Sequence, residues 1–224
     1  MMTNSKKSAP MLAGQVIQEK IRSGEFPLGS ALPGQRELAK ILGIGRPAIR
    51  EAISALEGLG LLRVEPGRGV FVASPGAAST RRWRFEARYS LDHVYAVREA
   101  LETLSVRLAT DRATAPDLKD LKNLVKRLKK AVDNDDLIEM SLADSEFHRK
   151  LALVSGNGLL LEMLDWFKTI LTESRNIAFA NPDPTRRSAP SIEHTKIIEA
   201  MEKRDRIAAA RLMKTHITNA RSRI

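Results

Sequence analysis

The spacing of apolar residues changes once along this chain, and that change limits the folds that the chain can adopt. Residues 11–73 contain three short helical patterns, followed by two strand patterns at 61–64 and 70–73. From residue 91 onward the apolar residues follow a helical period, and no segment resembles a strand. The sequence therefore predicts a mainly α protein, in which a three-helix unit with a terminal hairpin precedes an all-α helical bundle.

Polar and turn-forming segments set the expected domain boundaries. Residues 1–10 are expected to form a disordered tail, and the small residues at 74–82 indicate a linker over 74–90. These segments leave one domain at 11–73 and another at 91–224. Helices are expected near 12–23, 35–42 and 46–59 in the first domain, and near 91–112, 117–132, 135–155, 158–180, 189–203 and 205–221 in the second.

An excess of basic residues favours a polyanionic partner. The 224-residue chain has a formal charge of +10 and a pI of about 10.1. Residues 1–90 hold 14 lysines and arginines against 7 acidic residues, so most of the excess lies in the part that contains the hairpin unit. Soluble proteins of other classes are also basic, so charge alone does not establish nucleic-acid binding.

Composition also limits where the protein is expected to act. There are no cysteines, which excludes disulfides and thiolate metal ligands and is compatible with a reducing cytoplasm. The first ten residues lack the apolar stretch of a signal peptide, and no apolar run approaches the roughly 20 residues that cross a bilayer. We therefore expect a cytoplasmic protein with no membrane partner.

Two arginines on the third predicted helix form a candidate nucleic-acid surface. Arg46 and Arg50 lie one turn apart on the same face, opposite apolar residues that can pack inward. A guanidinium group can bond bidentately to guanine or clamp a phosphate. The alternative is a solvated charged face on a small helical domain. The same surface is expected to include Arg36 on the preceding helix, Pro47 at the helix start, and Arg68 and Gly69 at the hairpin tip.

Three of the four histidines could form a metal site in the bundle. Asp144 and His148 lie one turn apart on the helix expected at 135–155, while His194 and His216 fall on the last two predicted helices. One carboxylate and three imidazoles are a suitable ligand set for Zn²⁺, Ni²⁺, Mn²⁺ or Fe²⁺. Spacing alone does not show that these helices meet, and an ordinary pair on a helix surface is the alternative.

The first domain contains a characteristic series of segments, namely Leu32-Pro33, Arg36-Glu37-Leu38-Ala39, Gly43 through Ala52, Leu56, Gly60-Leu61 and Gly67 through Val72. These segments resemble the GntR-family winged helix-turn-helix, which binds DNA. The resemblance implies that Arg36, Arg46, Arg50 and Gly69 occupy DNA-contacting positions. Gly45 departs from the family pattern, in which Ser or Thr usually caps the recognition helix.

The second domain contains a second series of characteristic segments, namely Val97-Arg98, Leu101-Glu102, Asp144, Phe147-His148, Ser155-Gly156-Asn157, His194 with Ile197 and Ala200, and Asp205 with Ala209, Met213 and His216. These segments resemble the FCD ligand-binding domain of the FadR subfamily of GntR regulators. This resemblance implies a divalent metal held by Asp144, His148, His194 and His216, with zinc expected in the purified protein.

The resemblance also implies an effector and an assembly. A small carboxylate would fill the open coordination positions of the metal, with Arg98 at the family's cavity-facing position and Arg175 as a second candidate for the anionic end. A homodimer would bind a palindromic operator in double-stranded DNA, and repression relieved by the effector is the default expectation.

Two alternatives use the same histidines differently. A metal-dependent hydrolase would use the cluster to activate water, but it would leave the basic N-terminal domain without a role. We therefore expect a regulator and not an enzyme. A regulator that senses the metal itself, with no organic effector, stays open at this point.

Overall fold

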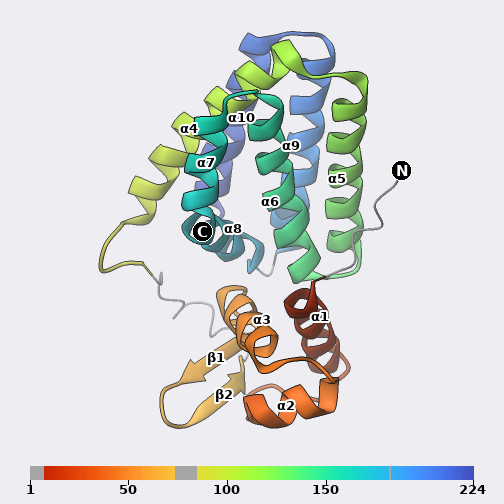
Figure 1. Ribbon diagram of the computed structural model, residues 1–224, viewed down its shortest axis with the longest axis vertical. Coiled ribbons are helices and arrows are strands. Elements are labelled where there is room, and N and C mark those ends of the chain that lie inside the picture. The colour runs from red at the N-terminus through yellow and green to blue at the C-terminus, as the bar shows by residue number, and fades with distance from the viewer. Residues whose placement is uncertain (1–7, 74–84, 182) are drawn as a thin grey trace. The chain divides into compact units, whose positions relative to one another are not determined.

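The computed structural model describes residues 8–73, 85–181 and 183–224, and the chain divides into two compact units (Figure 1). Most of the tail and of the linker expected from the sequence lies outside the described residues. The first unit contains α1 (Ala9–Arg22), α2 (Gln35–Leu42), α3 (Arg46–Gly58), β1 (Leu62–Glu65) and β2 (Gly69–Val72). Each predicted element of this unit is present, with bounds that differ by a few residues at most.

Apolar faces hold the three helices of the first unit together. Ile17 of α1, Leu38 of α2 and Ile49 of α3 are fully buried in its core, as their helical spacing predicts. β1 and β2 pair antiparallel, with Leu62 opposite Val72. The turn between them needs glycine, because Gly69 has a φ of 123°, which side chains rarely allow.

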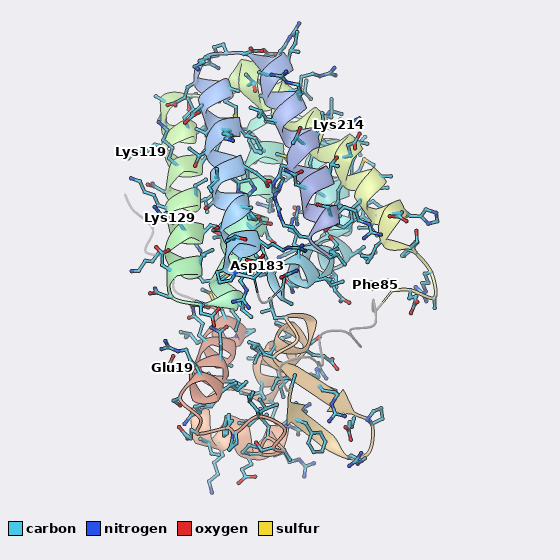
Figure 2. All side chains as sticks on the ribbon, turned by 180° about the vertical axis from the view of Figure 1, so that it is seen from behind. Glu19, Phe85, Lys119, Lys129, Asp183 and Lys214 are labelled. Carbon is cyan, nitrogen blue, oxygen red and sulfur yellow. The ribbon has the colours of Figure 1, made fainter. Side chains whose placement is uncertain are left out.

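The second unit is a bundle of helices, and none of the described helices has the length and apolarity needed to cross a bilayer. α10 packs against α4 and α9, and α5 packs against α6 and α9 (Figure 1). α5 turns Leu121 and Leu128 inward, while Lys119 and Lys129 extend outward (Figure 2). The helices are α4 (Leu91–Arg112), α5 (Ala115–Asp133), α6 (Leu137–Val154), α7 (Gly158–Trp166), α8 (Lys168–Phe179), α9 (Pro184–Glu202) and α10 (Arg206–Ser222).

Polar side chains at the helix starts explain where the bundle helices begin. Thr114 and Asp117 form a reciprocal capping box at α5. Asn157 accepts a hydrogen bond from the Leu160 amide and so caps the start of α7. Comparable caps at α4, α6, α9 and α10 come from Ser90, Asp136, Asp183 and Asp205.

Two predicted helices were wrong in extent. The segment expected as one helix over 158–180 is two helices, because the chain turns at Phe167, which ends α7 and precedes α8. The helix expected from 189 begins at Pro184, since proline fits the first turn and the Asp183 carboxylate accepts from the Thr185 amide. The helix then continues through Pro190, which is buried.

Candidate functional site

Three helices of the bundle bring the predicted metal ligands together. Asp144 and His148 project from α6, His194 from α9 and His216 from α10, and all four are buried. One ligand atom from each residue lies within 4.8 Å of the others. The Nε2 atoms of His194 and His216 are 3.3 Å apart, and Asp144 Oδ1 lies 3.6 Å from His194 Nε2. Helix packing thus collects residues that are up to 72 positions apart in the sequence.

Two glutamates orient rings of this cluster. Glu102 Oε2 lies 2.6 Å from His148 Nδ1, and Glu193 Oε2 lies 2.7 Å from His216 Nδ1. Each carboxylate occupies the Nδ1 side of its ring, which leaves His148 Nε2 facing Asp144 and His216 Nε2 facing His194. Such carboxylate–histidine pairs fix the tautomer and the orientation of metal-binding histidines. Neither glutamate was predicted as part of the site from the sequence.

Burial controls the charge of the cluster. Burial lowers the pKa of His148, and burial together with the nearby His216 and His148 rings lowers the pKa of His194 well below its usual value. Burial alone would raise the pKa of the Glu102 carboxyl, but Arg98, His148 and Arg175 hold it well below the usual range. These directions keep the Glu102 carboxylate ionised and the His148 and His194 rings neutral, and a neutral imidazole is the form of histidine that binds a metal.

The geometry of the cluster fits a single divalent cation. A metal–nitrogen bond of about 2.0–2.1 Å places the ligand atoms around one ion roughly 3–4 Å apart. The separation between His148 Nε2 and Asp144 Oδ2 is 3.8 Å. His194 Nε2 lies 3.6 Å from Asp144 Oδ1 and 3.3 Å from His216 Nε2. His148 Nε2 is buried and has no hydrogen-bond partner among the described residues, as expected of an atom that requires a further ligand.

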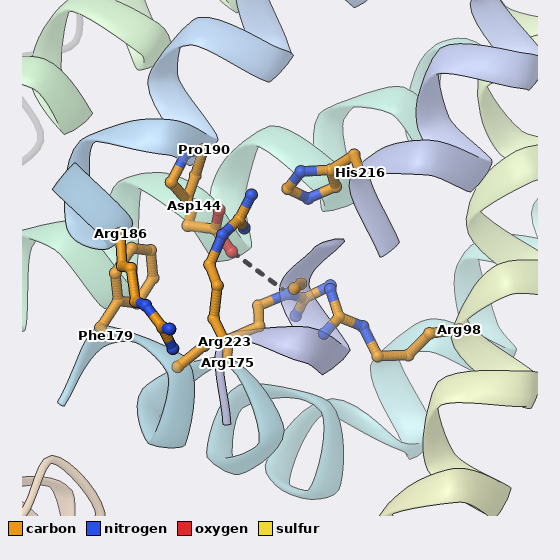
Figure 3. A pocket seen from close by; sticks show the side chains of 10 residues that line it. Arg98, Asp144, Arg175, Phe179, Arg186, Pro190, His216 and Arg223 are labelled. Carbon is orange, nitrogen blue, oxygen red and sulfur yellow. Dashed lines mark ion pairs between the residues drawn. The ribbon is translucent and has the colours of Figure 1, made fainter. Parts of the chain in front are cut away.

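A pocket adjoins the cluster, and both arginines expected to bind the effector line it (Figure 3). Arg98 Nε and Arg175 Nη2 lie 2.9 and 3.0 Å from the same oxygen, Glu102 Oε1. Arg175 Nε lies 3.3 Å from Asp144 Oδ2. The pocket also includes residues that the sequence reasoning missed: Ala178, Phe179, Arg186, Pro190, Ala220 and Arg223.

All six residues predicted to contact DNA are exposed on the first unit. Arg46 and Pro47 form the first turn of α3, and Arg50 follows one turn later. Gly45 caps this helix without a side-chain hydroxyl. The remaining three are Arg36 at the start of α2, Arg68 in the β1–β2 turn and Gly69 at the start of β2.

Intramolecular contacts hold the hairpin arginine. Arg68 forms an ion pair with Glu65, Nη1 to Oε2, at 2.5 Å. Its guanidinium carbon lies 5.7 Å from the centre of the Phe71 ring. These contacts keep the Arg68 side chain on the hairpin, where it stays exposed.

A helical unit with a hairpin beside its third helix, followed by a helical bundle with a buried ligand cluster, defines a two-domain winged-helix regulator. Residues 13–72 match the bacterial regulatory proteins of the gntR family, and residues 93–219 match the FCD domain. The chain belongs to the FCD-containing regulators of the GntR family. It is a DNA-binding transcriptional regulator and not an enzyme.

Curated relatives and solved structures agree with this assignment. The chain is 28% identical to the HTH-type transcriptional repressor NanR of Cronobacter sakazakii over 96% of this chain and 85% of the relative. It is 28% identical to a GntR structure from Streptococcus agalactiae, with a TM-score of 0.50 over 95% of this chain and 99% of that one. E. coli McbR/YncC shares the fold, with 19% identity and a TM-score of 0.56 over 97% of each chain.

Proposed function

We propose that this protein is a dimeric repressor whose affinity for a palindromic operator is controlled by a small carboxylate bound beside a divalent metal. The observation that carries the proposal is the buried cluster of one aspartate and three histidines next to an arginine-lined pocket. The relatives named as repressors support the direction of control. The protein would act in the cytoplasm, on double-stranded DNA.

Asp144, His148, His194 and His216 would hold the metal. When bound, a Zn²⁺, Ni²⁺, Mn²⁺ or Fe²⁺ ion would offer the effector an open position for a carboxylate oxygen. We expect zinc in protein purified without added metal. The Glu102 and Glu193 carboxylates would keep two of the rings turned toward the ion.

Arg98 and Arg175 would bind the effector carboxylate. Both guanidinium groups already lie against Glu102 Oε1, so an incoming carboxylate would share or replace that partner. Because Glu102 also contacts His148, the effector and the metal-binding ring would act on one buried residue. An effector can shift the conformation of the protein only by binding one state more tightly than the other.

The DNA-binding surface would consist of α3 and the hairpin. Arg46 and Arg50 would contact base edges or phosphates in the major groove, with Pro47 at the helix start. Arg36 would contact the adjacent backbone, and Arg68 with Gly69 would approach the minor groove.

A second copy of this chain would supply the other half-site contact. Two linked half-site contacts raise operator affinity through effective concentration. The bundle offers an apolar surface for pairing, because Leu159 and Trp166 of α7 are 63% and 71% exposed. Sedimentation of the parent and of Trp166→Glu would test this surface, and an unchanged dimer in the variant would exclude it.

The decisive experiment is a mobility-shift titration with metal-loaded protein. Operator binding should weaken when a bound carboxylic acid is added and should stay unchanged with the matching alcohol. If chelation alone changes operator affinity and no acid does, the protein senses the metal itself. If neither treatment has an effect, the cluster has no part in control.

A further inference from the structure

The pocket contains more cationic groups than one effector carboxylate requires. Four arginines line it from four parts of the bundle, namely Arg98 of α4, Arg175 of α8, Arg186 of α9 and Arg223 after α10. Among the described lining residues Asp144 is the one acid. Figure 3 shows Arg98 and Arg186 entering the pocket from opposite sides. The proposed function uses Arg98 and Arg175 and leaves the other two without a role.

Arg223 presents an unused donor to this pocket. The residue is 7% exposed, and its Nη2 forms an ion pair with Glu193. Its Nη1 is buried and has no hydrogen-bond partner among the described residues. Buried guanidinium donors are almost always paired, because losing water without a replacement is costly. An unpaired donor at the wall of a pocket is therefore the feature expected where a ligand supplies the acceptor.

Arg186 adds another cation to the lining of the pocket. Its side chain is half exposed and forms an ion pair with Asp183, with Nε and Oδ2 3.7 Å apart. Since that distance exceeds a hydrogen bond, the guanidinium group can turn to a ligand at little cost. Phe179 and Pro190 line the pocket as well, so part of the pocket wall is apolar.

The balance of charges around the pocket also favours a ligand with more than one negative charge. Glu102, Asp144 and the partly buried Glu193 neutralise Arg98, Arg175 and Arg223 around the pocket. A divalent cation in the cluster would add two positive charges that no further buried acid among the described residues offsets. A ligand with a single negative charge would leave one of them uncompensated at low dielectric.

We propose that the effector carries two anionic groups, and that Arg223 together with Arg186 binds the one that does not reach the cluster. The inference rests on the proposed function, since it assumes that a small acid occupies this pocket. The second group is a carboxylate or a phosphate, because an arginine fork binds either one bidentately. A dicarboxylate or a phosphorylated carboxylic acid is therefore the expected ligand class.

Calorimetric titrations of the metal-loaded, full-length protein with two matched pairs of acids would test this proposal. Lactate is compared with malate, and glycerate with 3-phosphoglycerate, so that within each pair a second anionic group is added. The parent should bind malate tenfold or more tightly than lactate, or 3-phosphoglycerate tenfold or more tightly than glycerate. A preference for malate identifies the second anionic group as a carboxylate, and a preference for 3-phosphoglycerate identifies it as a phosphate. Equal affinities within both pairs, including no measurable binding by any of the four acids, would overturn the proposal.

Two variants separate the second anion site from the rest of the pocket. Arg186→Gln should reduce the preference for the dianion to threefold or less and leave the affinity for the monoanion within twofold. Arg223→Gln should do the same, with metal content measured alongside because Arg223 contacts Glu193. Lys196→Gln, at an exposed position of α9, serves as the control for a lost surface charge. An unchanged preference in both arginine variants would refute the assignment.

The outcomes also distinguish this inference from the proposed function. The first outcome is that acids with one anionic group bind and weaken operator binding, while acids with two anionic groups bind no more tightly. In that case the second anion site is refuted, and the proposal of a carboxylate-controlled regulator stands. If acids bind but operator affinity never responds, the failure lies with the proposed function.

Discussion

Glu102 Oε2 lies 2.6 Å from His148 Nδ1, while the other oxygen of the same carboxylate lies 2.9 Å from Arg98 Nε. One buried carboxylate thus contacts a ring of the metal-ligand cluster and an arginine of the pocket wall. Glu102 is 1% exposed, so water cannot substitute for it. Glu102 therefore connects the proposed metal site to the proposed effector pocket.

We expect Glu102→Gln to weaken metal binding by about 10- to 100-fold, because the amide holds the His148 ring less firmly and lowers its basicity. Competition against a chromogenic chelator measures the affinity, and circular dichroism checks the fold. Glu99→Gln is the control on the same helix, since Glu99 pairs only at the surface with Lys214.

Glu102→Gln removes the negative charge that pairs with the buried Arg98 and Arg175. Because buried charges without a partner are costly, this variant is also expected to fold less stably. Glu193→Gln therefore supplies an independent test through His216, and it should lower metal affinity over a similar range. Metal affinities within threefold of the parent in both glutamine variants would contradict an orienting role.

Metal removal should destabilise the bundle. Binding to the folded state adds about 4.1 kcal/mol at a free-ligand concentration 1,000 times the dissociation constant. Calorimetry with and without chelator should therefore show a lower unfolding temperature for the second unit after chelation. His216→Ala should abolish that difference, whereas His93→Ala, at an exposed position near the start of α4, should retain it. A chelator effect that persists in His216→Ala would exclude the cluster as its origin.

Much of the fold follows from local patterns in the sequence. The hairpin and the third helix were predicted because glycines, arginines and apolar residues fall at informative spacings in 43–72. The break at Phe167 was missed because apolar residues continue through it, and the turn depends on how α7 and α8 pack against α6. Periodicity reports which face of a helix is apolar, and it does not report where the helix axis changes direction.

The candidate site was only partly predictable. The four proposed metal ligands came from rare residue types together with the resemblance to the FCD domain, and the structure brings these four residues together. Glu102 follows Arg98 by one turn, a spacing typical of surface salt bridges, and nothing local indicates that both are 1% exposed. The sequence around Arg223 does not indicate that this arginine lines a pocket either, because its burial comes from packing against residues of α9 such as Glu193. Charged residues acquire such roles from tertiary burial, which spacing does not encode.

Operator affinity should depend on the exposed arginines of α3. Where the arginine contacts a base, Arg46→Ala or Arg50→Ala should weaken the binding free energy by about 1–3 kcal/mol. Where it contacts a phosphate, the substitution should reduce by about 1 the slope of log affinity against log salt concentration. Fluorescence anisotropy at several salt concentrations measures both quantities. Arg22→Ala is a suitable control, because Arg22 is an exposed arginine of α1 paired with Glu19. Unaltered affinity and salt slope in both α3 variants would refute the proposed DNA surface.

The capping box of α5 predicts a pH-dependent contribution to stability. Hydrogen bonds from Thr114, with help from Lys150, lower the pKa of Asp117 to about 2. Because this pKa lies below the unfolded value near 3.9, the stabilisation is complete above that value and disappears as the pH falls toward 2. Because solvent screens this largely exposed carboxylate, Asp117→Asn should cost about 0.5–1 kcal/mol at neutral pH, and the cost should shrink below about pH 4.

Urea denaturation of the parent and Asp117→Asn from about pH 6 to about pH 3 measures that difference. Asp120→Asn provides the matched control, since Asp120 also lies on α5 and pairs with Lys150, with Oδ2 and Nζ 3.0 Å apart, but caps no helix. Its effect on the free energy of unfolding should stay within about 0.5 kcal/mol, as for most exposed ion pairs. A cost for Asp117→Asn that is equal at both ends of the pH range would show that the carboxylate charge does not stabilise this helix start.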